Sequence, residues 1–304
     1  MKANVFVLPE RGGALLVDKP VGPTSHDVVA WARKTLGTKR VGHTGTLDPF
    51  ASGLLVLLFG PATRLAEYLS GHAKTYTATA CLGVRTNTHD FQGRVLEQAG
   101  DAAPVEREKV EAELSRFEGL IRQVPPQYSA KKVDGEAMYR KARRGEVVEL
   151  EPVEVEVSEM RLTAFDGRHL SFEVTCSAGT YIRALARDLG ENLGVGAHLT
   201  ALRRTSVGEF SIDRALAGEA LQIGVHPDSG QWIPAEAAVR HMPTVHVSDE
   251  QVTLLCNGMR IPMPEEMAES GTLVSLVDGA GLLGIAEVKE GQLVPKKILQ
   301  SALV

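Results

Sequence analysis

Apolar positions along the chain follow two different spacings. Between Thr75 and Leu82 every second side chain is apolar, which is the period of a β-strand with one buried face. After Thr24, apolar residues recur at helical intervals as far as Leu36, and Gly37 suits the left-handed conformation that ends many helices. Thr24 and Asp27 resemble a capping box, which marks the start of that helix. The use of both spacings predicts an α+β fold.

The other elements of this region follow from the same two spacings. Short apolar or alternating runs predict strands at residues 14–18, 54–59, 153–157 and 170–176. Helical spacing predicts helices at 61–70, 110–117 and 182–189. The proline pair Pro125–Pro126 interrupts the pattern and leads into a basic segment. We therefore expect a mixed sheet flanked by helices, with an inserted basic element at about 123–146 that protrudes.

Beyond about residue 243 the pattern changes to short strands. A helix capped by Ser248 ends at Asn257–Gly258, and strands are predicted at 272–277, 282–288 and 293–298. Asp278–Gly279 and Glu290–Gly291 are dipeptides typical of tight hairpins. This texture predicts a small β-barrel-like module. We predict two domains, covering residues 1–243 and 244–304.

The composition is that of an ordinary globular protein, with 304 residues, 43% hydrophobic and 23% charged. A net charge of −5 does not favour nucleic-acid binding, so the distribution of charge matters more than its sum. Cations gather in one segment and could contact an RNA backbone, or could form a solvated helix face. They are Lys131, Lys132, Arg140, Lys141, Arg143 and Arg144, with a second pair at Arg203–Arg204.

Cysteine and histidine usage predicts neither disulfides nor a metal. The three cysteines, Cys81, Cys176 and Cys256, are far apart, and the nine histidines show no ligand spacing. The first residues lack the features of a secretory leader, and no apolar run reaches membrane-spanning length. We expect a cytoplasmic protein with no metal, no membrane contact and, since phosphate-binding and dinucleotide motifs are missing, no nucleotide cofactor.

One loop stands out as a candidate for chemistry. Residues 42–49 read Gly-His-Thr-Gly-Thr-Leu-Asp-Pro, with a single acid, Asp48, ahead of Pro49. Proline restricts the residue before it to extended geometry, so the loop presents one carboxylate in a defined direction. A purely structural turn of the Leu-Asp-Pro type is the alternative.

Four segments occur in the order found in a known family. Besides residues 42–49 they are Lys19–Pro20 with Gly22, Thr24 and Ser25; Lys74–Thr75–Tyr76; and Gly179–Thr180–Tyr181–Ile182–Arg183. In this the chain resembles the TruB-type tRNA pseudouridine synthases over most of residues 12–210. The resemblance implies a largely antiparallel sheet of the pseudouridine synthase type and a C-terminal PUA domain, an RNA-binding module.

The resemblance also implies a function. The protein would isomerise uridine 55 in the T-loop of tRNA to pseudouridine, with the base flipped out of its stack, without a cofactor and without an obligatory protein partner. RNA binding could in addition assist tRNA folding. Asn87 stands where the family has an acid in Thr-Asp-Thr, while the rest of the loop around Asp90 is family-like.

The resemblance assigns roles to single residues. Asp48 is the catalytic carboxylate, as a nucleophile or as a base, and Arg183 holds it charged. An ordinary surface arginine on a helix is the alternative for Arg183. His43 fills the site that the base vacates, and Tyr76 packs on the flipped uracil and accepts or relays its C5 proton. Two more residues, Tyr181 and Leu202, line the pocket. Lys19 either supports the catalytic loop or touches phosphate.

Three rival functions remain possible from the sequence. A phosphate-binding transferase would use the glycines at 42–53 as an anion cradle, but a strand rather than a helix follows them. A glycoside hydrolase or nucleosidase would need a second acid beside Asp48. A non-catalytic RNA-binding protein would leave Asp48 dispensable, and such a role can coexist with catalysis.

Overall fold

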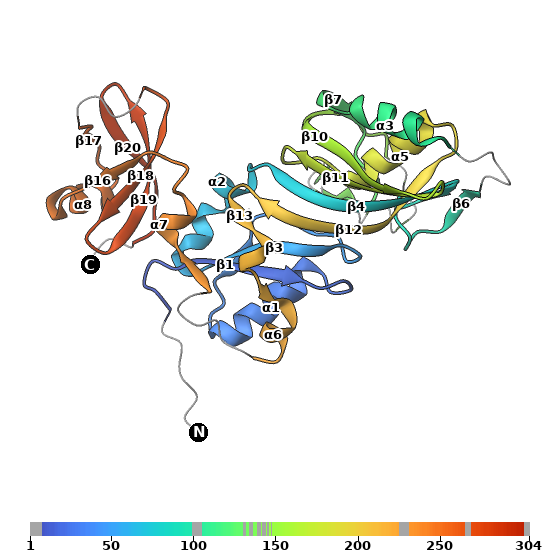
Figure 1. Cartoon of the computed structure of the whole chain (residues 1–304). Helices are drawn as coiled ribbons and strands as arrows, with labels where there is room; N and C mark the ends of the chain where they lie inside the picture. The colour runs from blue at the N-terminus through green and yellow to red at the C-terminus, as the bar shows by residue number, and fades with distance from the viewer. Residues whose placement is uncertain are drawn as a thin grey trace. The chain divides into compact units, whose positions relative to one another are not determined.

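We describe the protein from a computed structural model, which defines residues 8–98, 105–129, 132–133, 136–138, 141, 144, 146, 148–224, 231–264 and 269–300. It is an α+β structure, as the sequence predicts, and its elements are labelled in Figure 1. Contacts divide the chain into two compact units. Unit 1 comprises Met1–Pro49, Leu54–Gly71 and Ile212–Val304, and unit 2 comprises Phe50–Gly53 and His72–Ser211.

In unit 1, the first strand neighbours β3 (Ser52–Phe59) in the sheet and also pairs with strands from much later in the chain. β1 (Gly13–Lys19) runs parallel to β14 (Leu216–Ala217) and antiparallel to β15 (Trp232–Pro234). β2 (Val41–His43) pairs antiparallel with β3 (Ser52–Phe59), whose first two residues belong to unit 2. The apolar side chains of β1 and β3 are almost completely buried, so these strands supply much of the core of unit 1.

Helix α1 (Ser25–Leu36) begins and ends where the sequence predicts. The Thr24 hydroxyl accepts a hydrogen bond from the Asp27 N–H at 3.1 Å, and the Asp27 carboxylate accepts one from the Thr24 N–H at 2.8 Å. Gly37 closes the helix with a φ of 64°. The helix predicted from Pro61 begins instead as a 3-10 turn. The other helical segments of this unit are η1 (Gly60–Leu65), α2 (Ala66–Ser70), η2 (Ile212–Arg214), α6 (Gly218–Gln222) and α7 (Ala235–Ala238).

The C-terminal part of unit 1 forms a separate five-stranded sheet, red in Figure 1. Its strand order is β16 (Thr244–His246), β18 (Leu273–Asp278), β19 (Gly281–Lys289), β20 (Gln292–Ile298) and β17 (Ile261–Pro262). Helix α8 (Asp249–Cys256) has the predicted cap at Ser248. All five strands lie beyond residue 243. The domain boundary between 243 and 244 stays a prediction.

The two hairpins of this sheet turn near the predicted dipeptides. Glu290 and Gly291 have φ angles of 51° and 71°, as the tight two-residue turn requires. In the other hairpin Asp278 pairs with Gly281, so the turn lies one residue later than the Asp278–Gly279 dipeptide suggested.

Arg11 links this sheet to the N-terminal segment of unit 1. Its guanidinium lies 2.5 Å from the Asp278 carboxylate, and it donates to the Gly281 carbonyl at 3.1 Å and to the Gln300 side chain at 3.0 Å. The Arg11 and Asp278 side chains are only 10% and 8% exposed. Removing one partner of such a shielded pair destabilises the folded protein, because the other charge is left buried.

Unit 2 is built on an antiparallel sheet whose strands come from widely separated parts of the chain. The order is β12 (Ala197–Val207), β4 (Lys74–Leu82), β11 (His169–Cys176), β10 (Val153–Phe165) and β7 (Gly119–Gln123). Residues 52 and 53 of β3 pair in parallel with Arg203 and Arg204 of β12. Parallel pairs at β1–β14 and β3–β12 beside many antiparallel pairs confirm the predicted mixed, largely antiparallel architecture.

Two helices cover this sheet, and unit 2 also contains two small hairpins. Helices α3 (Arg107–Ser115) and α5 (Ile182–Asn192) contact each other and pack on β10 and β12 (Figure 1). One hairpin pairs β5 (Val84–Thr86) with β6 (Val95–Gln98), and the other pairs β8 (Lys132–Val133) with β9 (Glu136–Ala137). A further short strand, β13 (Phe210–Ser211), pairs with β12. No helix in the described part of the chain is long and apolar enough to cross a membrane.

Strand β12 is the main element that the sequence analysis missed. Its alternation is broken by two arginines and by irregular pairing with β4 at two points. The interpretation of Arg203–Arg204 as a surface cation pair is wrong for Arg204, which is only 1% exposed. A buried arginine in a strand has no signature in the hydrophobic pattern, because the pattern assumes that charged side chains face water.

We predict that Gly53→Ala destabilises the protein. Gly53 has a φ of 107°, and a Cβ there would lie 2.3 Å from the Arg204 carbonyl oxygen and 2.6 Å from its amide nitrogen. Backbone strain and the clash should together lower the free energy of unfolding by about 2 to 4 kcal/mol, measured from urea unfolding curves.

Gly71→Ala is the matched control, since its φ of −74° and ψ of −11° suit alanine and a Cβ there meets open space. It should change the free energy of unfolding by no more than about 0.5 to 1 kcal/mol. Equal losses in both variants would contradict the close approach of Gly53 to β12.

Candidate functional site

The loop that carries Asp48 is anchored on both sides of this residue. Before it, the Ser25 hydroxyl of α1 accepts a hydrogen bond from the Leu47 N–H at 2.9 Å and donates one to the Leu47 carbonyl at 3.1 Å. After it, the Pro49 carbonyl accepts a hydrogen bond from the Gly22 N–H at 2.8 Å. Asp48 itself is half-buried. The fixed backbone therefore presents its carboxylate in a defined position that solvent or a ligand can still reach.

Lys19 supports this loop from below the surface. Its side chain is completely buried, and the ammonium donates to the carbonyl oxygens of Pro20 at 2.7 Å, Pro23 at 2.8 Å and Pro49 at 3.5 Å. A buried ammonium requires such acceptors, because burial without hydrogen bonds is costly. Of the two roles predicted for Lys19, these contacts favour the support of the loop over contact with phosphate.

His43 lies on β2, at the start of the same loop, and is half-buried. The exposed ring of His26, in the first turn of α1, packs edge-on against it, with the ring centroids 6.2 Å apart and the planes at 80°. The sequence analysis did not single out His26. A histidine in the first turn of a helix has no pattern that separates it from an ordinary surface residue.

Tyr76 is 7% exposed on β4, opposite Arg204 of β12. Lys74, two residues earlier on the same strand, is also buried, and burial together with the charge of Arg204 lowers the pKa of Lys74 to about 8. Leu202 is 8% exposed and lies opposite Ala78. Tyr76 and Leu202 therefore belong to the same two neighbouring strands, in a region that combines apolar surface with buried positive charge.

Tyr181 is positioned by its main chain. It is the residue before helix α5, and both its backbone groups bond to the side chain of Gln123 at the end of β7. The Gln123 amide oxygen accepts from the Tyr181 N–H at 2.8 Å, and its amide nitrogen donates to the Tyr181 carbonyl at 3.1 Å. Gln123 is completely buried. The sequence analysis missed this residue, because a glutamine two residues before a proline pair indicates a loop rather than a buried anchor.

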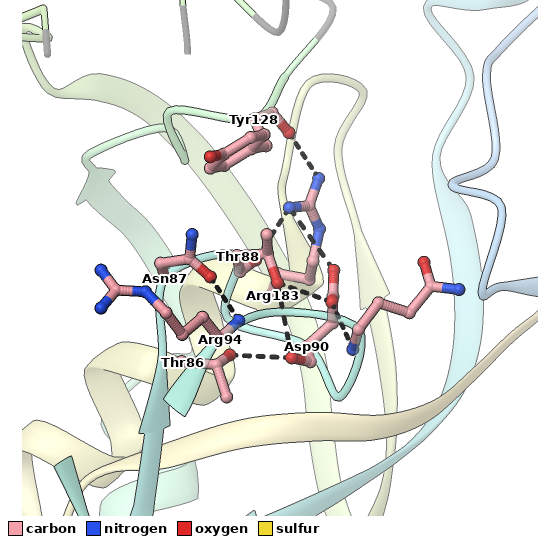
Figure 2. A network of polar contacts seen from close by, with 8 residues as sticks. Thr86, Asn87, Thr88, Asp90, Arg94, Tyr128 and Arg183 are labelled. Carbon is pink, nitrogen blue, oxygen red and sulfur yellow. Dashed lines mark hydrogen bonds and ion pairs between the residues drawn. The ribbon is translucent and has the colours of Figure 1, made fainter. Parts of the chain in front are cut away.

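Arg183, in the first turn of α5, is the centre of a polar network shown in Figure 2. The guanidinium donates to the carbonyl oxygens of Thr88 at 2.9 Å and Tyr128 at 2.8 Å, and it lies 3.8 Å from the Asp90 carboxylate. Arg183 and Asp90 are only 4% and 5% exposed. The network rules out the surface-arginine alternative for Arg183 and fixes its guanidinium in place.

The loop between β5 and β6 supplies the other half of this network. The Asp90 carboxylate accepts hydrogen bonds from the Thr88 hydroxyl at 2.7 Å and the Gln92 N–H at 3.0 Å. Asn87 closes the loop, as its side-chain oxygen accepts from the Arg94 N–H at 2.8 Å (Figure 2). An amide oxygen thus serves as the acceptor at position 87, where the related family has a carboxylate.

The predicted site residues fall into two groups, one in each unit. Unit 1 holds Lys19, His43 and Asp48 around the loop, and unit 2 holds Tyr76, Tyr181, Arg183 and Leu202 on β4, β12 and the start of α5. Within unit 2, Phe50 is almost completely buried and packs edge-on against Phe91 of the Asp90 loop, with ring centroids 5.9 Å apart. The chain two residues after Asp48 therefore touches the loop that binds Arg183.

The predicted RNA-contacting cations are only partly defined. Lys131, Arg140 and Arg143 lie outside the described residues, and of Lys132 the backbone alone is described, in β8. Lys141 is half-buried. Arg144 is exposed and pairs with Glu146 at 2.7 Å.

Within the described ranges, no cluster of three or more histidine, cysteine, aspartate or glutamate side chains could hold a metal ion. The three cysteines are free thiols, of which Cys81 and Cys176 are buried. Burial raises the pKa of the Cys176 thiol to about 11, so this thiol is protonated at neutral pH and chemically quiet.

Three protein-family models match successive parts of the chain. Residues 33–182 match the model described as "TruB family pseudouridylate synthase (N terminal domain)". Residues 183–228 match "tRNA pseudouridylate synthase B C-terminal domain", and residues 243–299 match "Pseudouridine synthase II TruB, C-terminal".

Curated proteins and solved structures agree with the family models. The tRNA pseudouridine synthase B of Burkholderia lata is 44% identical over 297 residues, covering 95% of this chain and 91% of that protein. The protein of the same name from Azoarcus sp. is 43% identical over 295 residues, covering 96% and 97%. Among solved structures, an H/ACA RNP bound to a substrate RNA containing 2′-deoxyuridine and a Cbf5–Nop10–Gar1 complex each hold a chain with a TM-score of 0.72. Their identities are 26% and 27%, and each match covers 96% of this chain and 86% of the other.

We predict that His89→Asn makes the protein more resistant to acid. Burial and the charges of Arg187, Arg183 and Arg85 lower the pKa of His89 from 6.5 to about 4. In the unfolded chain the imidazole binds a proton below pH 6.5, whereas in the folded protein it does so only below about 4. Stability is therefore lost as the pH falls through this window, by up to about 3 kcal/mol.

Asparagine cannot titrate there, and it tolerates the φ of 61° at this position. Urea unfolding at pH 7 and at pH 4.5 should show a smaller loss for His89→Asn than for the wild type. His246→Asn, at an exposed position, is the control and should lose as much as the wild type. An identical acid response in all three proteins would contradict the shielding of His89 by its cationic neighbours.

Proposed function

Because the chain belongs to the TruB family of pseudouridine synthases, we propose that it isomerises uridine 55 in the T-loop of tRNA, with Asp48 as the catalytic carboxylate. The protein is a pseudouridine synthase, an isomerase that acts on uridine in tRNA. The observation that carries the finer proposal is the half-buried carboxylate of Asp48 on a loop held by Ser25, Gly22 and Lys19.

The reaction defines what the site has to do. The N1–C1′ bond of uridine breaks, the uracil turns, and a C5–C1′ bond forms, while a proton leaves C5 and N1 ends protonated. The atoms and electrons balance without a co-reactant. The protein must supply a carboxylate, an environment that keeps it ionised, and a pocket that holds the turning base. Asp48 acts either as nucleophile or as base in this scheme.

Arg183 keeps Asp48 ionised in this proposal. A guanidinium has five N–H donors and stays charged when buried, so it can serve a second carboxylate besides Asp90. Covalent geometry supports the pairing. Asp48 precedes Ser52 by four residues, and four residues span at most about 14 Å. Ser52 pairs with β12 in unit 2, and Phe50 packs on the loop that binds Arg183.

The remaining site residues accommodate the flipped uracil and the position that it leaves in the RNA. Removing a uridine from its stack costs a few kcal/mol, and aromatic stacking returns about 1 to 3 kcal/mol per base. His43, braced by His26, fills the vacated position in the RNA. Tyr76 packs on the uracil and takes part in moving the C5 proton. Tyr181, which is half-buried and held by Gln123 through its backbone, lines the pocket together with Leu202, which is 8% exposed.

The protein's RNA contacts extend beyond the flipped base. The basic segment grips the tRNA backbone, and the C-terminal five-stranded module acts as a PUA-like RNA-binding domain. Binding can also assist tRNA folding, with no obligatory protein partner and no metal. A cytoplasmic location fits the presence of tRNA there and the three free thiols.

We predict that Asp48→Asn abolishes product formation and leaves RNA binding nearly unchanged. The amide keeps the size of the side chain but cannot act as a nucleophile or a base, so turnover should fall by at least about 10³-fold. The assay incubates purified protein with uridine-labelled tRNA transcript, digests the RNA and measures pseudouridine. A filter-binding assay gives the affinity in parallel.

Asp166→Asn, at an exposed carboxylate in the β10–β11 turn, is the control and should retain full turnover. Normal turnover by Asp48→Asn would contradict the proposed mechanism, in which Asp48 is the catalytic carboxylate. A wild-type protein that binds RNA without forming pseudouridine would favour the non-catalytic rival.

We also predict that neutralising the basic segment weakens RNA binding and its salt dependence. Lys131, Lys132, Arg140, Lys141, Arg143 and Arg144 are changed to glutamine together. Each lost phosphate contact should lower the slope of log affinity against log salt by about 0.7 to 0.9. Turnover of RNA already bound should change much less, which single-turnover assays at saturating enzyme concentration measure.

Arg107 and Lys109, exposed cations of α3, provide the control when changed to glutamine. Their loss should affect neither the affinity nor the slope. If the affinity and slope of the six-fold variant also stay at the wild-type values, the segment is a solvated face and does not bind RNA.

A further inference from the structure

Phe91 is an exposed aromatic residue that the reaction scheme does not use. It is 48% exposed, and it is the single aromatic among the large hydrophobic residues that are exposed in the described part of the chain. It lies on the loop between β5 and β6, directly after Asp90. A phenyl ring left half in water forgoes the stabilisation that burial gives, so its position needs a reason.

The backbone on both sides of Phe91 is held in place. Asp90 precedes Phe91, and its carboxylate contacts Arg183. The same carboxylate accepts a hydrogen bond at 3.0 Å from the N–H of Gln92, which follows Phe91. The His89 carbonyl accepts the Leu199 N–H of β12 at 3.0 Å. The ring is therefore carried by a loop fixed to the sheet, and little conformational entropy is lost when a ligand contacts it.

One side of the Phe91 ring is also fixed. Phe50, which is 2% exposed, packs against it nearly at a right angle, with an interplanar angle of 88° and ring centroids 5.9 Å apart. This is the preferred geometry of an aromatic pair. The contact orients the ring and leaves the rest of it open to solvent.

The position of Phe91 connects it to the proposed reaction. Phe50 follows Asp48 by two residues, and Asp90, which precedes Phe91, contacts Arg183. Arg94, which closes the same loop, is an exposed cation. A fixed, open aromatic ring on the same loop as a cation suits the binding of unpaired nucleobases by stacking, independently of their sequence.

We propose that Phe91 is a stacking platform for an unpaired nucleobase of the RNA substrate, one next to the flipped uridine in the loop. The inference rests on the proposed function, since it assumes an RNA loop at this site. The ligand is a base that stays in the RNA loop, and Phe91 takes no part in bond making or breaking. Its role is to hold the loop in register while the target uridine is in the pocket.

A purely structural role is the alternative, in which Phe91 only covers Phe50. The two roles respond differently to substitution. Phe91→Leu keeps an apolar contact with Phe50 but has no aromatic face, whereas Phe91→Trp keeps the face and enlarges it. Phe91→Ala removes both. Urea unfolding of each variant reports the packing on Phe50 separately from RNA binding.

The test measures the affinity of each full-length variant for a T-stem-loop RNA. Stacking on one base predicts that Phe91→Ala and Phe91→Leu bind about 5-fold to 150-fold more weakly, while Phe91→Trp binds at least as well as the wild type. KM should rise with little change in kcat. Leu120→Ala, at a 70% exposed position on β7, is the matched control and should bind normally.

A second set of RNAs identifies the contacted base. Each unpaired loop nucleotide other than the target is replaced in turn by an abasic site. At one position, loss of the base should weaken binding of the RNA to the wild type. The same abasic RNA should bind Phe91→Ala no more weakly than the intact RNA binds Phe91→Ala. Such non-additive losses are the signature of a direct contact.

The inference is overturned if Phe91→Leu binds as tightly as the wild type, or if no abasic position removes the difference between wild type and Phe91→Ala. These results are distinct from failure of the proposed function. That failure appears as a wild-type protein that makes no pseudouridine, or as an active Asp48→Asn variant. A wild-type protein that does not bind the T-stem-loop RNA overturns both proposals.

Discussion

The backbone pairing of residues 52–53 with β12 is the constraint on which the candidate site depends. It determines where the chain goes directly after the Asp48 loop, and it needs Gly53, because the Arg204 backbone leaves no room for a Cβ. β12 in turn pairs with β4, so the strand that carries Tyr76 is the next neighbour. A few hydrogen bonds between main chains thus fix residues 52–53, which follow Asp48 in the sequence, beside the strands that carry the aromatic and cationic side chains.

The buried charges of Lys19 in unit 1 and Arg183 in unit 2 both have polar partners. Lys19 is surrounded by carbonyl oxygens, and Arg183 by two carbonyls and a carboxylate. Each charged side chain orders a loop whose backbone lacks the regular hydrogen bonds of a helix or sheet. The loops before and after the site are therefore fixed by single long side chains. This is an economical way to hold loops that must stay open to a large substrate.

Local patterns predicted much of the fold. The capping box at Thr24, the alternation along β4, the apolar stripe of α5 and the Glu290–Gly291 turn depend on neighbours in sequence, and all four occur in the structure. β12 was missed because its arginines break the alternation, and their environment depends on strands more than a hundred residues away. Gln123 and His26 were missed for the same reason, since their partners are set by tertiary packing. The candidate residues themselves came from ordered motifs, whereas the contacts that position them required the structure.

The pairing of β1 has a consequence for how the protein is made. β1 has one early partner, β3, but its other partners come from residues 216–217 and 232–234, and Arg11 just before it contacts Asp278. A ribosome exposes the first strand long before it has made these later partners. Unit 1 therefore cannot finish folding until nearly the whole polypeptide has emerged, while β4, β10, β11 and β12 of unit 2 are complete at residue 207. The order of translation favours a nascent chain in which the middle folds first and the two ends close around their own core last.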